Sequence, residues 1–337
     1  MRYAILGAGY IAPINAAALM KCEDAEIALI ANRTREKALA VRSQLGLSCP
    51  VYTDYKEALD QEKPDAAVIC VFNDQHREYF LECAKRGIHI LCEKPLANTY
   101  ADCLFMEEAA KRYGIRVSVL QTQRYGAVLT TAADYIDRNL SVLGKLCTVV
   151  DNMSCHYFWD GRSPWHLDNV RSGGGIVLNY GVHQLDRVHY MLTVGSGEAE
   201  TVEFTGRAIM AKPGVETCSS YSMFGVTCNG IPYTVSCAGY CGPGMNEMIL
   251  NFQNGTVKAV LSGNGIEERG VYVSPAVENG GTRFEKIPLL CEDGEGAHEM
   301  YVREMKEADR YLKGLVPEPP VPMKWAAEMV RLCEEIL

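Results

Sequence analysis

Short apolar runs alternate with helical stretches through the first third of the chain, and this alternation constrains the fold most. The runs cover residues 3–6, 26–32, 66–72, 88–92 and 116–120, with a brief one at 51–52. Continuous apolar strands separated by helices are typical of a parallel sheet that is covered on both faces. Residues 1–122 therefore predict a doubly wound α/β domain.

A glycine-rich turn follows the first run, with the sequence Gly7-Ala8-Gly9-Tyr10-Ile11-Ala12. In a nucleotide-binding Rossmann domain the first glycine of this motif permits a tight turn, and the second lets the backbone approach a pyrophosphate. We therefore expect NAD(P) to bind here, in contact with Gly7, Gly9, Tyr10 and Ile11. The alternative is a glycine turn that serves backbone geometry alone.

The end of the second run reads Asn32-Arg33-Thr34-Arg35. NAD-selecting domains normally place an Asp or Glu there, which accepts hydrogen bonds from the adenosine ribose. Here no carboxylate would repel a 2′-phosphate, and two guanidinium groups are near enough in sequence to neutralise one. The sequence thus favours NADP(H) over NAD(H). In the alternative, Arg33 and Arg35 are solvated and Asn32 binds the ribose of NAD.

From about residue 123 the alternation stops, and after a helix at 127–139 the chain reads mostly as strands joined by tight turns. Asn229-Gly230 and Asn254-Gly255 each separate two apolar runs, and Asn-Gly favours the type I′ turn of a β-hairpin. We expect an α+β domain over 123–337, with a large, mostly antiparallel open sheet that packs one face on helices. The other face is either a homo-oligomer interface or a solvated polar surface.

A lysine stands where the fifth run ends, in Leu91-Cys92-Glu93-Lys94-Pro95. Ligands of doubly wound sheets bind at the carboxyl ends of the strands, so this position lies at the binding crevice. Burial there would favour the neutral amine, which can exchange a proton with a substrate hydroxyl. A lysine without such a position is usually a solvated surface charge.

Three motifs, Gly7-x-Gly9, Asn73-x-x-His76 and Glu93-Lys94-Pro95, together resemble the glucose–fructose oxidoreductase, inositol dehydrogenase and rhizopine-catabolism (Gfo/Idh/MocA) family. In that family three consecutive glycines and an Asp-x-Gly-x-His motif follow in the second domain. Here Gly173-Gly174-Gly175 precedes Asn179-Tyr180-Gly181-Val182-His183 and Asp186, in the same order and spacing. The resemblance covers essentially the whole chain.

The resemblance implies catalytic roles for Lys94 and His183, with Asn179 at the place of the family's usual aspartate. Asparagine does not titrate, so proton transfer would rest on Lys94 and His183, while Asn179 orients a hydroxyl or the lysine. The alternative for His183 is a histidine of the core.

The resemblance also completes the set of expected site residues. Further nucleotide-binding residues would be Val71, Asn73, His76, Glu93, Lys94 and Gln121. The substrate-binding residues would be Lys94, Arg124, Trp165, Asn179 and His183. An indole face suits stacking on a sugar or cyclitol ring, although a Trp also packs well in a core. A polar and aromatic cluster remains without an assigned role: His156, Tyr157, Trp159 and His166.

Composition excludes several partners. The net charge of −9, without a block rich in Lys and Arg, argues against nucleic acid or anionic lipid. No apolar stretch reaches the ~20 residues that span a bilayer. The 14 cysteines are scattered without a Cys-x-x-Cys pair, which is typical of reduced thiols in the cytoplasm. His183 and His189 have no carboxylate at metal-ligand spacing, so we expect no metal site.

Three functions fit these observations. The first is a dehydrogenase or reductase that transfers a hydride between nicotinamide C4 and a hydroxyl or carbonyl carbon of a sugar, sugar derivative or cyclitol. The second oxidises a sugar only transiently, since a ketone acidifies the neighbouring C–H and permits elimination, epimerisation or glycoside cleavage. The third is a non-catalytic regulator that senses nucleotide, against which Lys94 and His183 argue.

Overall fold

The chain divides into two compact units in the computed structural model, which describes residues 1–210, 214–262, 267–275, 283–294 and 298–337. Unit 1 comprises Met1–Thr122 and Gly294–Arg331, and unit 2 comprises Gln123–Asp293 and Leu332–Leu337. The sequence placed all of 123–337 in one domain, so the grouping of Gly294–Arg331 with unit 1 differs from that expectation.

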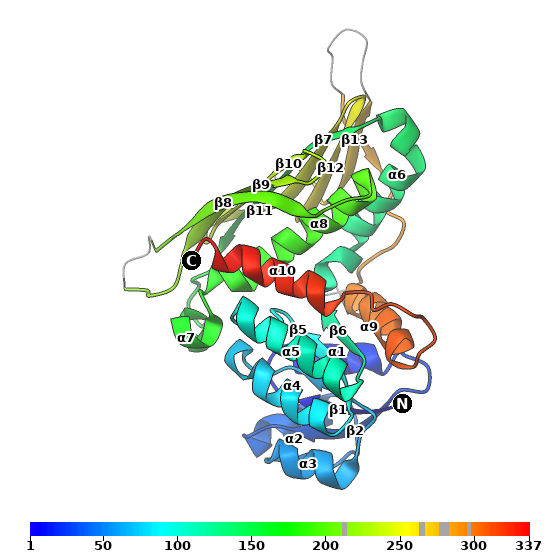
Figure 1. Ribbon diagram of the computed structural model, residues 1–337, viewed down its shortest axis with the longest axis vertical. Coiled ribbons are helices and arrows are strands. Elements are labelled where there is room, and N and C mark those ends of the chain that lie inside the picture. Colours follow the sequence, from blue (N-terminus) through cyan, green and yellow to red (C-terminus); the bar gives the residue numbers. More distant parts are fainter. Residues whose placement is uncertain (211–213, 263–266, 276–282, 295–297) are drawn as a thin grey trace. The chain divides into compact units, whose positions relative to one another are not determined.

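Unit 1 contains a six-stranded sheet in the order β3-β2-β1-β4-β5-β6, with every neighbouring pair parallel (Figure 1). Its strands are β1 Arg2–Leu6, β2 Glu26–Ala31, β3 Val51–Tyr52, β4 Ala66–Ile69, β5 His89–Glu93 and β6 Val117–Leu120. The helices between them are α1 Ala12–Leu19, α2 Arg35–Gln44, α3 Tyr55–Glu62, α4 His76–Lys85 and α5 Tyr100–Tyr113. This strand order is that of a Rossmann domain, and it brings the carboxyl ends of all the strands to one edge.

Helix α9, His298–Leu312, belongs to unit 1 because it packs on α1 and on the strands β5 and β6. Tyr3 Oη donates a hydrogen bond of 2.6 Å to the buried carboxylate of Asp309. Beyond α9, the N–H of Val119 donates to the carbonyl of Val321 at 3.2 Å. The sequence did not predict this return to unit 1, because an amphipathic helix does not reveal which surface it covers.

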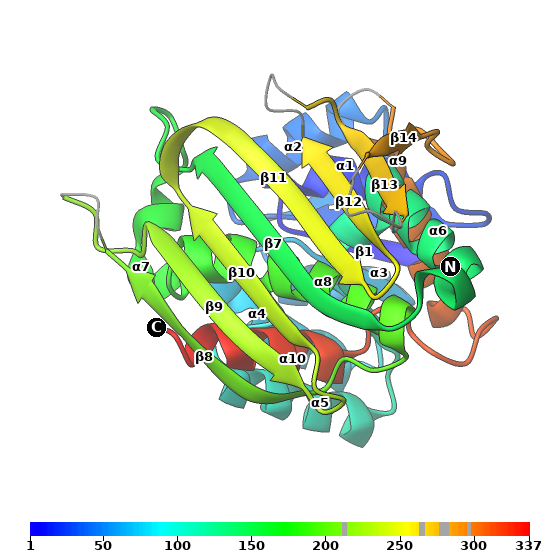
Figure 2. The same ribbon diagram turned by 90° about the horizontal axis from the view of Figure 1, so that it is seen from above.

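Unit 2 contains an eight-stranded sheet in the order β14-β13-β12-β11-β7-β10-β9-β8, which Figure 2 shows face on. Its strands are β7 Leu146–His156, β8 Thr201–Ile209, β9 Ser220–Thr227, β10 Pro232–Ala238, β11 Tyr240–Phe252, β12 Gly255–Ser262, β13 Gly270–Pro275 and β14 Glu285–Ile287. The pairs are antiparallel except for β10 with β7. Helices α6 Ala127–Leu143 and α8 Val182–Ser196 pack against this sheet, and α10 Met323–Glu334 crosses from unit 1 into unit 2. The predicted fold class is confirmed.

The first Asn-Gly hairpin forms, but its turn is not of the predicted type I′. That turn requires positive φ at both central residues, and only Gly230, with φ 80°, has it. The Thr227 N–H donates to the carbonyl of Ile231 at 3.0 Å, and the Thr227 hydroxyl accepts from the Ile231 N–H at 3.0 Å. The strands β9 and β10 are therefore joined by a three-residue loop, 228–230.

In the second hairpin the loop is 253–254, and Gly255 already pairs with Phe252. Neither Asn254 nor Gly255 has positive φ, so the type I′ prediction is wrong here as well. The N–H groups of Gln253 and Asn254 donate to the carbonyls of Lys145 and Leu143, at 2.8 and 2.9 Å. Contacts with the end of α6 therefore determine this turn.

A buried polar network fixes α8 to the sheet. Arg187 donates to both carboxylate oxygens of Asp151 at 2.6 Å, and both side chains are 0% exposed. Gln184 donates to Asp151 at 2.5 Å and accepts from the hydroxyl of Tyr221. Since a buried charge is stable only when it is paired and hydrogen-bonded, this network determines how α8 lies across β7 and β9. It also positions the residues that directly precede α8.

Across the described ranges, no helix combines the length and the apolar character that crossing a bilayer requires. The described cysteines are free thiols, most of them buried.

Candidate functional site

Two glycines of the loop between β1 and α1 are glycine for different reasons. Gly7 has φ 102°, and a Cβ there would lie 2.4 Å from the carbonyl oxygen of Cys70. A larger residue would have to move that backbone. A Cβ at Gly9 would meet no atom within 4 Å. Packing within the protein therefore explains Gly7 alone, whereas a glycine at position 9 suits the close approach of a bound pyrophosphate.

The segment after β2 supports this loop. Asn32 Oδ1 accepts from the Ala8 N–H at 3.1 Å, and Asn32 Nδ2 donates to the Thr34 carbonyl at 2.8 Å. The Arg35 guanidinium donates to the Val51 carbonyl at 3.2 Å. Arg33 is exposed and forms no ion pair with any described residue. Asn32 and Arg35 are thus hydrogen-bonded to the backbone, whereas the guanidinium of Arg33, the remaining residue predicted to select the cofactor, is exposed.

His76 connects the segments that follow β4 and β5. Its ring is 1% exposed, with Nδ1 2.9 Å from the Pro95 carbonyl and Nε2 3.2 Å from the Val71 carbonyl. Burial is the largest influence on its pKa and lowers it, against the raising effect of the hydrogen bonds. A neutral imidazole donates from one nitrogen only, so we assign the donated bond to the shorter contact, with Pro95.

Strand β5 ends on Glu93, which is buried. Asn15 on α1 donates to Glu93 Oε1 at 2.7 Å, and the backbone N–H of Lys94 donates to Oε2 at 3.2 Å. Burial raises the pKa of Glu93, while these bonds and the charge of Lys94 oppose the rise. Lys94 itself is half-buried and joins Pro95 through a cis peptide bond. Asn15, which the sequence analysis missed, thus links the helix of the glycine loop to the candidate catalytic lysine.

The other predicted nucleotide residues lie at the same edge of the sheet. Val71 and Asn73 follow β4, and Gln121 follows β6. Gln121 is 1% exposed, and its side-chain oxygen has no hydrogen-bond partner in the described ranges. Ile11 caps α1, while Tyr10 is 87% exposed. The predicted nucleotide residues therefore lie at the carboxyl ends of β1, β2, β4, β5 and β6.

Helix α9 adds residues that sequence reasoning missed. Glu304 is 1% exposed and accepts from the Thr122 hydroxyl at 2.6 Å. Burial is the main reason why the pKa of Tyr301 is raised, and the charges of Glu93 and Glu304 raise it further. The available signal was a Tyr and a Glu three positions apart on one face of an amphipathic helix.

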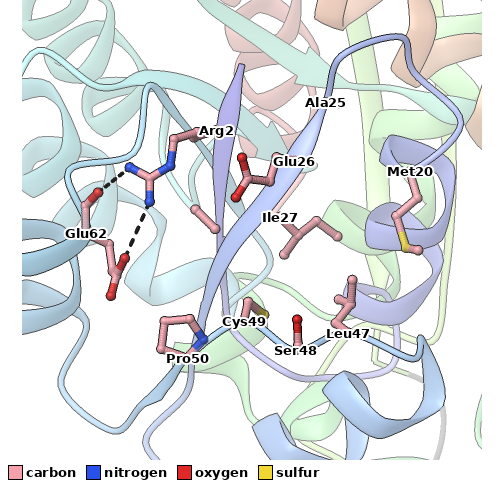
Figure 3. A pocket seen from close by; sticks show the side chains of 11 residues that line it. Arg2, Met20, Ala25, Glu26, Ile27, Leu47, Ser48, Cys49, Pro50 and Glu62 are labelled. Atoms are coloured by element: carbon pink, nitrogen blue, oxygen red, sulfur yellow. Dashed lines mark hydrogen bonds and ion pairs between the residues drawn. The ribbon is translucent and has the colours of Figure 1, made fainter.

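A cavity of about 490 Å³ lies in unit 1, but at the opposite edge of the sheet (Figure 3). It is lined by the first residues of β1 and β2, Arg2 and Glu26, and by Cys49 just before β3. Arg2 donates to the Glu62 carbonyl at 2.6 Å and approaches its carboxylate at 3.4 Å. Ligands of such sheets bind at the carboxyl ends of the strands, so we do not place the nucleotide in this cavity.

In unit 2, three glycines lead into an unusual turn. Gly173 ends the short helix α7, Asn169–Ser172, and Gly174 and Gly175 have φ 118° and 63°. A Cβ at Gly175 would lie 2.6 Å from the Thr217 side chain. The chain then forms a π-helical turn, Val177–Gly181, immediately before α8. Such turns are rare and occur frequently at functional sites, and this one carries Asn179.

Asn179 lies in a polar and aromatic cluster. Its Nδ2 donates to Tyr157 Oη at 3.2 Å and lies 3.5 Å from His166 Nδ1. The rings of Trp165 and His166 are in contact at a tilt of 30°, with centroids 3.8 Å apart. The Arg162 guanidinium lies over the ring of Tyr157, 3.5 Å from its centroid. Tyr157 and His166, which the sequence left without a role, are thus neighbours of the predicted site residue Asn179, and Arg162 is an addition.

The other predicted residues of unit 2 are placed differently. Arg124 forms a buried ion pair with Asp186 of α8, with Nε 3.2 Å from the carboxylate. His183 is half-buried in the first turn of α8. Trp159 is half-exposed, and His156 is exposed. Within the described ranges, no group of three or more His, Cys, Asp or Glu side chains could hold a metal ion.

Sequence comparison places this fold and site in a known class. The oxidoreductase family with an NAD-binding Rossmann fold, Gfo/Idh/MocA, matches residues 1–121, and the Gfo/Idh/MocA C-terminal domain matches residues 139–258. The chain belongs to the Gfo/Idh/MocA oxidoreductase family.

Individual relatives are distant. The chain is 29% identical over 217 residues to 1,5-anhydro-D-fructose reductase of Ensifer adhaerens, covering 64% of this chain and 63% of the relative. It is 27% identical over 210 residues to 2,7-anhydro-N-acetylneuraminate hydratase of Mediterraneibacter gnavus, covering 60% of this chain and 52% of the relative. The match thus spans less than two thirds of each relative. A levoglucosan dehydrogenase in complex with NADH shares the fold, with a TM-score of 0.83 at 18% identity over 100% of this chain and 95% of that one.

Proposed function

We propose that the protein is an NAD(P)-dependent oxidoreductase acting on a CH–OH group of a sugar, sugar derivative or cyclitol. The observation that carries the proposal is the contrast between Gly7 and Gly9, because the second glycine has no explanation in the packing of the chain itself. A bound nicotinamide would supply the hydride acceptor or donor at its C4. The names of the relatives support a carbohydrate substrate.

In this proposal, residues of the chain bind the cofactor and the substrate and transfer the proton of the reacting hydroxyl. Gly7, Gly9 and the amino end of α1 hold the pyrophosphate, and Lys94 exchanges a proton with the reacting hydroxyl. His183 shares that role, and Asn179 orients a substrate oxygen. Trp165 offers a ring face to the sugar. Arg124, whose guanidinium is positioned by its ion pair with Asp186, also binds the substrate.

We further propose that NADP(H) is preferred. Arg33 is exposed and has no acidic partner among the described residues, and no carboxylate stands at the end of β2 to repel a 2′-phosphate. The engagement of Asn32 with Ala8 and Thr34 also argues against a ribose contact through its side chain.

The test is a panel of sugars, cyclitols and their acids, assayed in both directions with NAD(H) and NADP(H) by absorbance at the reduced nicotinamide band. We expect turnover of at least one panel member, faster with the phosphorylated cofactor. Lys94→Met should abolish turnover while cofactor affinity stays within a few-fold. A folded protein that binds the cofactor but changes no carbohydrate would contradict the proposal.

A second candidate is redox-assisted modification of a sugar, in which the hydride returns after an elimination or epimerisation. The hydratase among the relatives favours it, because hydration is not a net oxidation. Product formation without net absorbance change would select this candidate over the first.

We also propose a cytoplasmic homo-oligomer that associates through the open face of the eight-stranded sheet. Val150 and Phe224 on β7 and β9 are exposed apolar residues of this face, at 36% and 41%. Free cysteines throughout the described chain fit a reducing compartment. Light scattering should show an oligomer that Phe224→Lys weakens, and a monomeric wild type would contradict this interface.

A further inference from the structure

Arg162 is a cation of the Asn179 cluster in unit 2, and no carboxylate of the described residues forms an ion pair with it. It follows β7 in the loop that leads to α7, and its backbone N–H closes a turn on the Trp159 carbonyl at 3.2 Å. Its Nε is buried and has no hydrogen-bond partner in the described ranges. Two acidic residues of the same loop do not pair with it: Asp160 is exposed, and Asp168 caps α7 and pairs with Arg171.

The groups that do surround Arg162 are neutral. The guanidinium lies on the face of Tyr157, and Tyr157 and Tyr180 both interact with it through their hydroxyls. Burial is the main cause of the raised pKa of both phenols, so they remain protonated at neutral pH despite the nearby positive charge. Cation–π contacts and neutral acceptors offset only part of the cost of burying a charge.

One thiol also faces this charge. The pKa of Cys155 is lowered, mainly by its interaction with Cys237 and to a smaller extent by Arg162, while burial opposes the change. Register supports the placement, because Met153 of β7 pairs with Cys237 of β10, and Cys155 lies two residues further on the same face. A cysteine sulfur is a weak hydrogen-bond acceptor compared with a carboxylate, so Cys155 does not replace a carboxylate counter-ion for Arg162.

Asn179 does not compensate the positive charge of Arg162. Its amide is neutral, and it lies beside Tyr157, whose ring carries the Arg162 guanidinium. Among the described contacts, this cluster contains Arg162 and His166 and no carboxylate. The side chain at position 179 thus adds no negative charge beside Arg162.

We propose that Arg162 binds a carboxylate of the substrate, so that this enzyme acts on a sugar acid rather than on a neutral sugar. A planar guanidinium can donate two parallel hydrogen bonds to a carboxylate, and such bonds are strong where water is excluded. The proposal rests on the proposed function, since it names the substrate class of the same site. It makes Arg162 a specificity-determining residue.

The experiment measures binding by calorimetry to the full chain saturated with reduced cofactor, using D-glucuronate against D-glucose and D-galacturonate against D-galactose. In the wild type we expect each acid to bind at least tenfold more tightly than its neutral partner. Arg162→Met should remove that preference, and Arg162→Lys should restore part of it. Arg171→Met removes a neighbouring, ion-paired arginine and should leave the preference intact.

Two further arms separate the alternatives. Asn179→Asp should weaken binding of the acids, because an internal carboxylate then competes for Arg162. D-glucose 6-phosphate binding more tightly than D-glucuronate would overturn the carboxylate assignment. Equal affinity for acids and neutral sugars, or a preference that survives in Arg162→Met, would overturn the inference. If neutral sugars are nevertheless turned over, the proposed function stands without it, whereas turnover of no carbohydrate would reject both.

Discussion

The candidate site of unit 1 is formed mainly by the backbone, whereas that of unit 2 is formed by side chains. In unit 1 the predicted residues lie at strand ends, and the key positions are backbone features: Gly7 avoids a carbonyl oxygen and Gly9 leaves open space. In unit 2 the site is a cluster of side chains from a loop and a π-helical turn, held in place by buried charges on α8. Substitutions that add atoms to the glycine loop should therefore affect the site of unit 1 most. Substitutions that remove a charge should affect the site of unit 2 most.

The largest effect should come from the buried charges of unit 2. Arg187→Met leaves Asp151 buried without its cation, and breaking such a pair costs about 3–5 kcal/mol of unfolding free energy. Arg207→Met, at an exposed arginine of β8, is the matched control and should change stability little. Urea denaturation measures both. Equal, small losses would show that the network does not hold α8.

The glycine loop of unit 1 should respond to a single methyl group. Gly7→Ala forces a clash with the Cys70 carbonyl at positive φ, and we expect a loss of about 2–4 kcal/mol. Gly9→Ala should leave the unfolding free energy nearly unchanged and weaken cofactor binding. Denaturation together with a cofactor titration separates the two. A Gly9→Ala protein with wild-type cofactor affinity would contradict the assignment of this loop.

A smaller effect should mark the choice of cofactor. Removing one charge-assisted contact costs about 1.5–3 kcal/mol, so Arg33→Ala should weaken NADP(H) binding by about 10–100-fold and NAD(H) binding much less. Lys37→Ala removes an exposed cation of α2 and serves as the control. Fluorescence titration with both cofactors gives the ratio. The same loss for both cofactors would reject a phosphate contact.

The smallest effect concerns pH. The folded pKa of His76 is lowered, mainly by burial, so the unfolded chain takes up the proton first on acidification. The contribution of His76 to stability is therefore complete above the ordinary histidine pKa of about 6.5 and is lost as the pH falls below it. Denaturation at pH values from about 5 to about 8, the range in which histidine titrates, gives the unfolding free energy as a function of pH. We expect His76→Gln to make this dependence on pH weaker. An unchanged slope in the variant would contradict this.

The difference between the units also explains what the sequence could predict. Strand ends that carry Gly7, Glu93 or Lys94 are visible because the motif lies within one continuous segment. Arg162 and Tyr157 join Asn179 through strand register and a loop path, so neither spacing nor residue type reveals their contact. The same reason hid Asn15, whose amide binds Glu93 across 78 positions of the chain. The type I′ turns were mispredicted because Thr227 and the end of α6 override the Asn-Gly preference.

The central claim is that this chain transfers a hydride between a carbohydrate carbon and a nicotinamide. It is tested most directly with the best panel substrate deuterated at the reacting carbon, followed by NMR of the recovered cofactor. We predict one deuterium at nicotinamide C4 for each oxidised substrate, and none with Lys94→Met. Product that forms while the deuterium goes to solvent, with the cofactor unlabelled throughout, would contradict the claim.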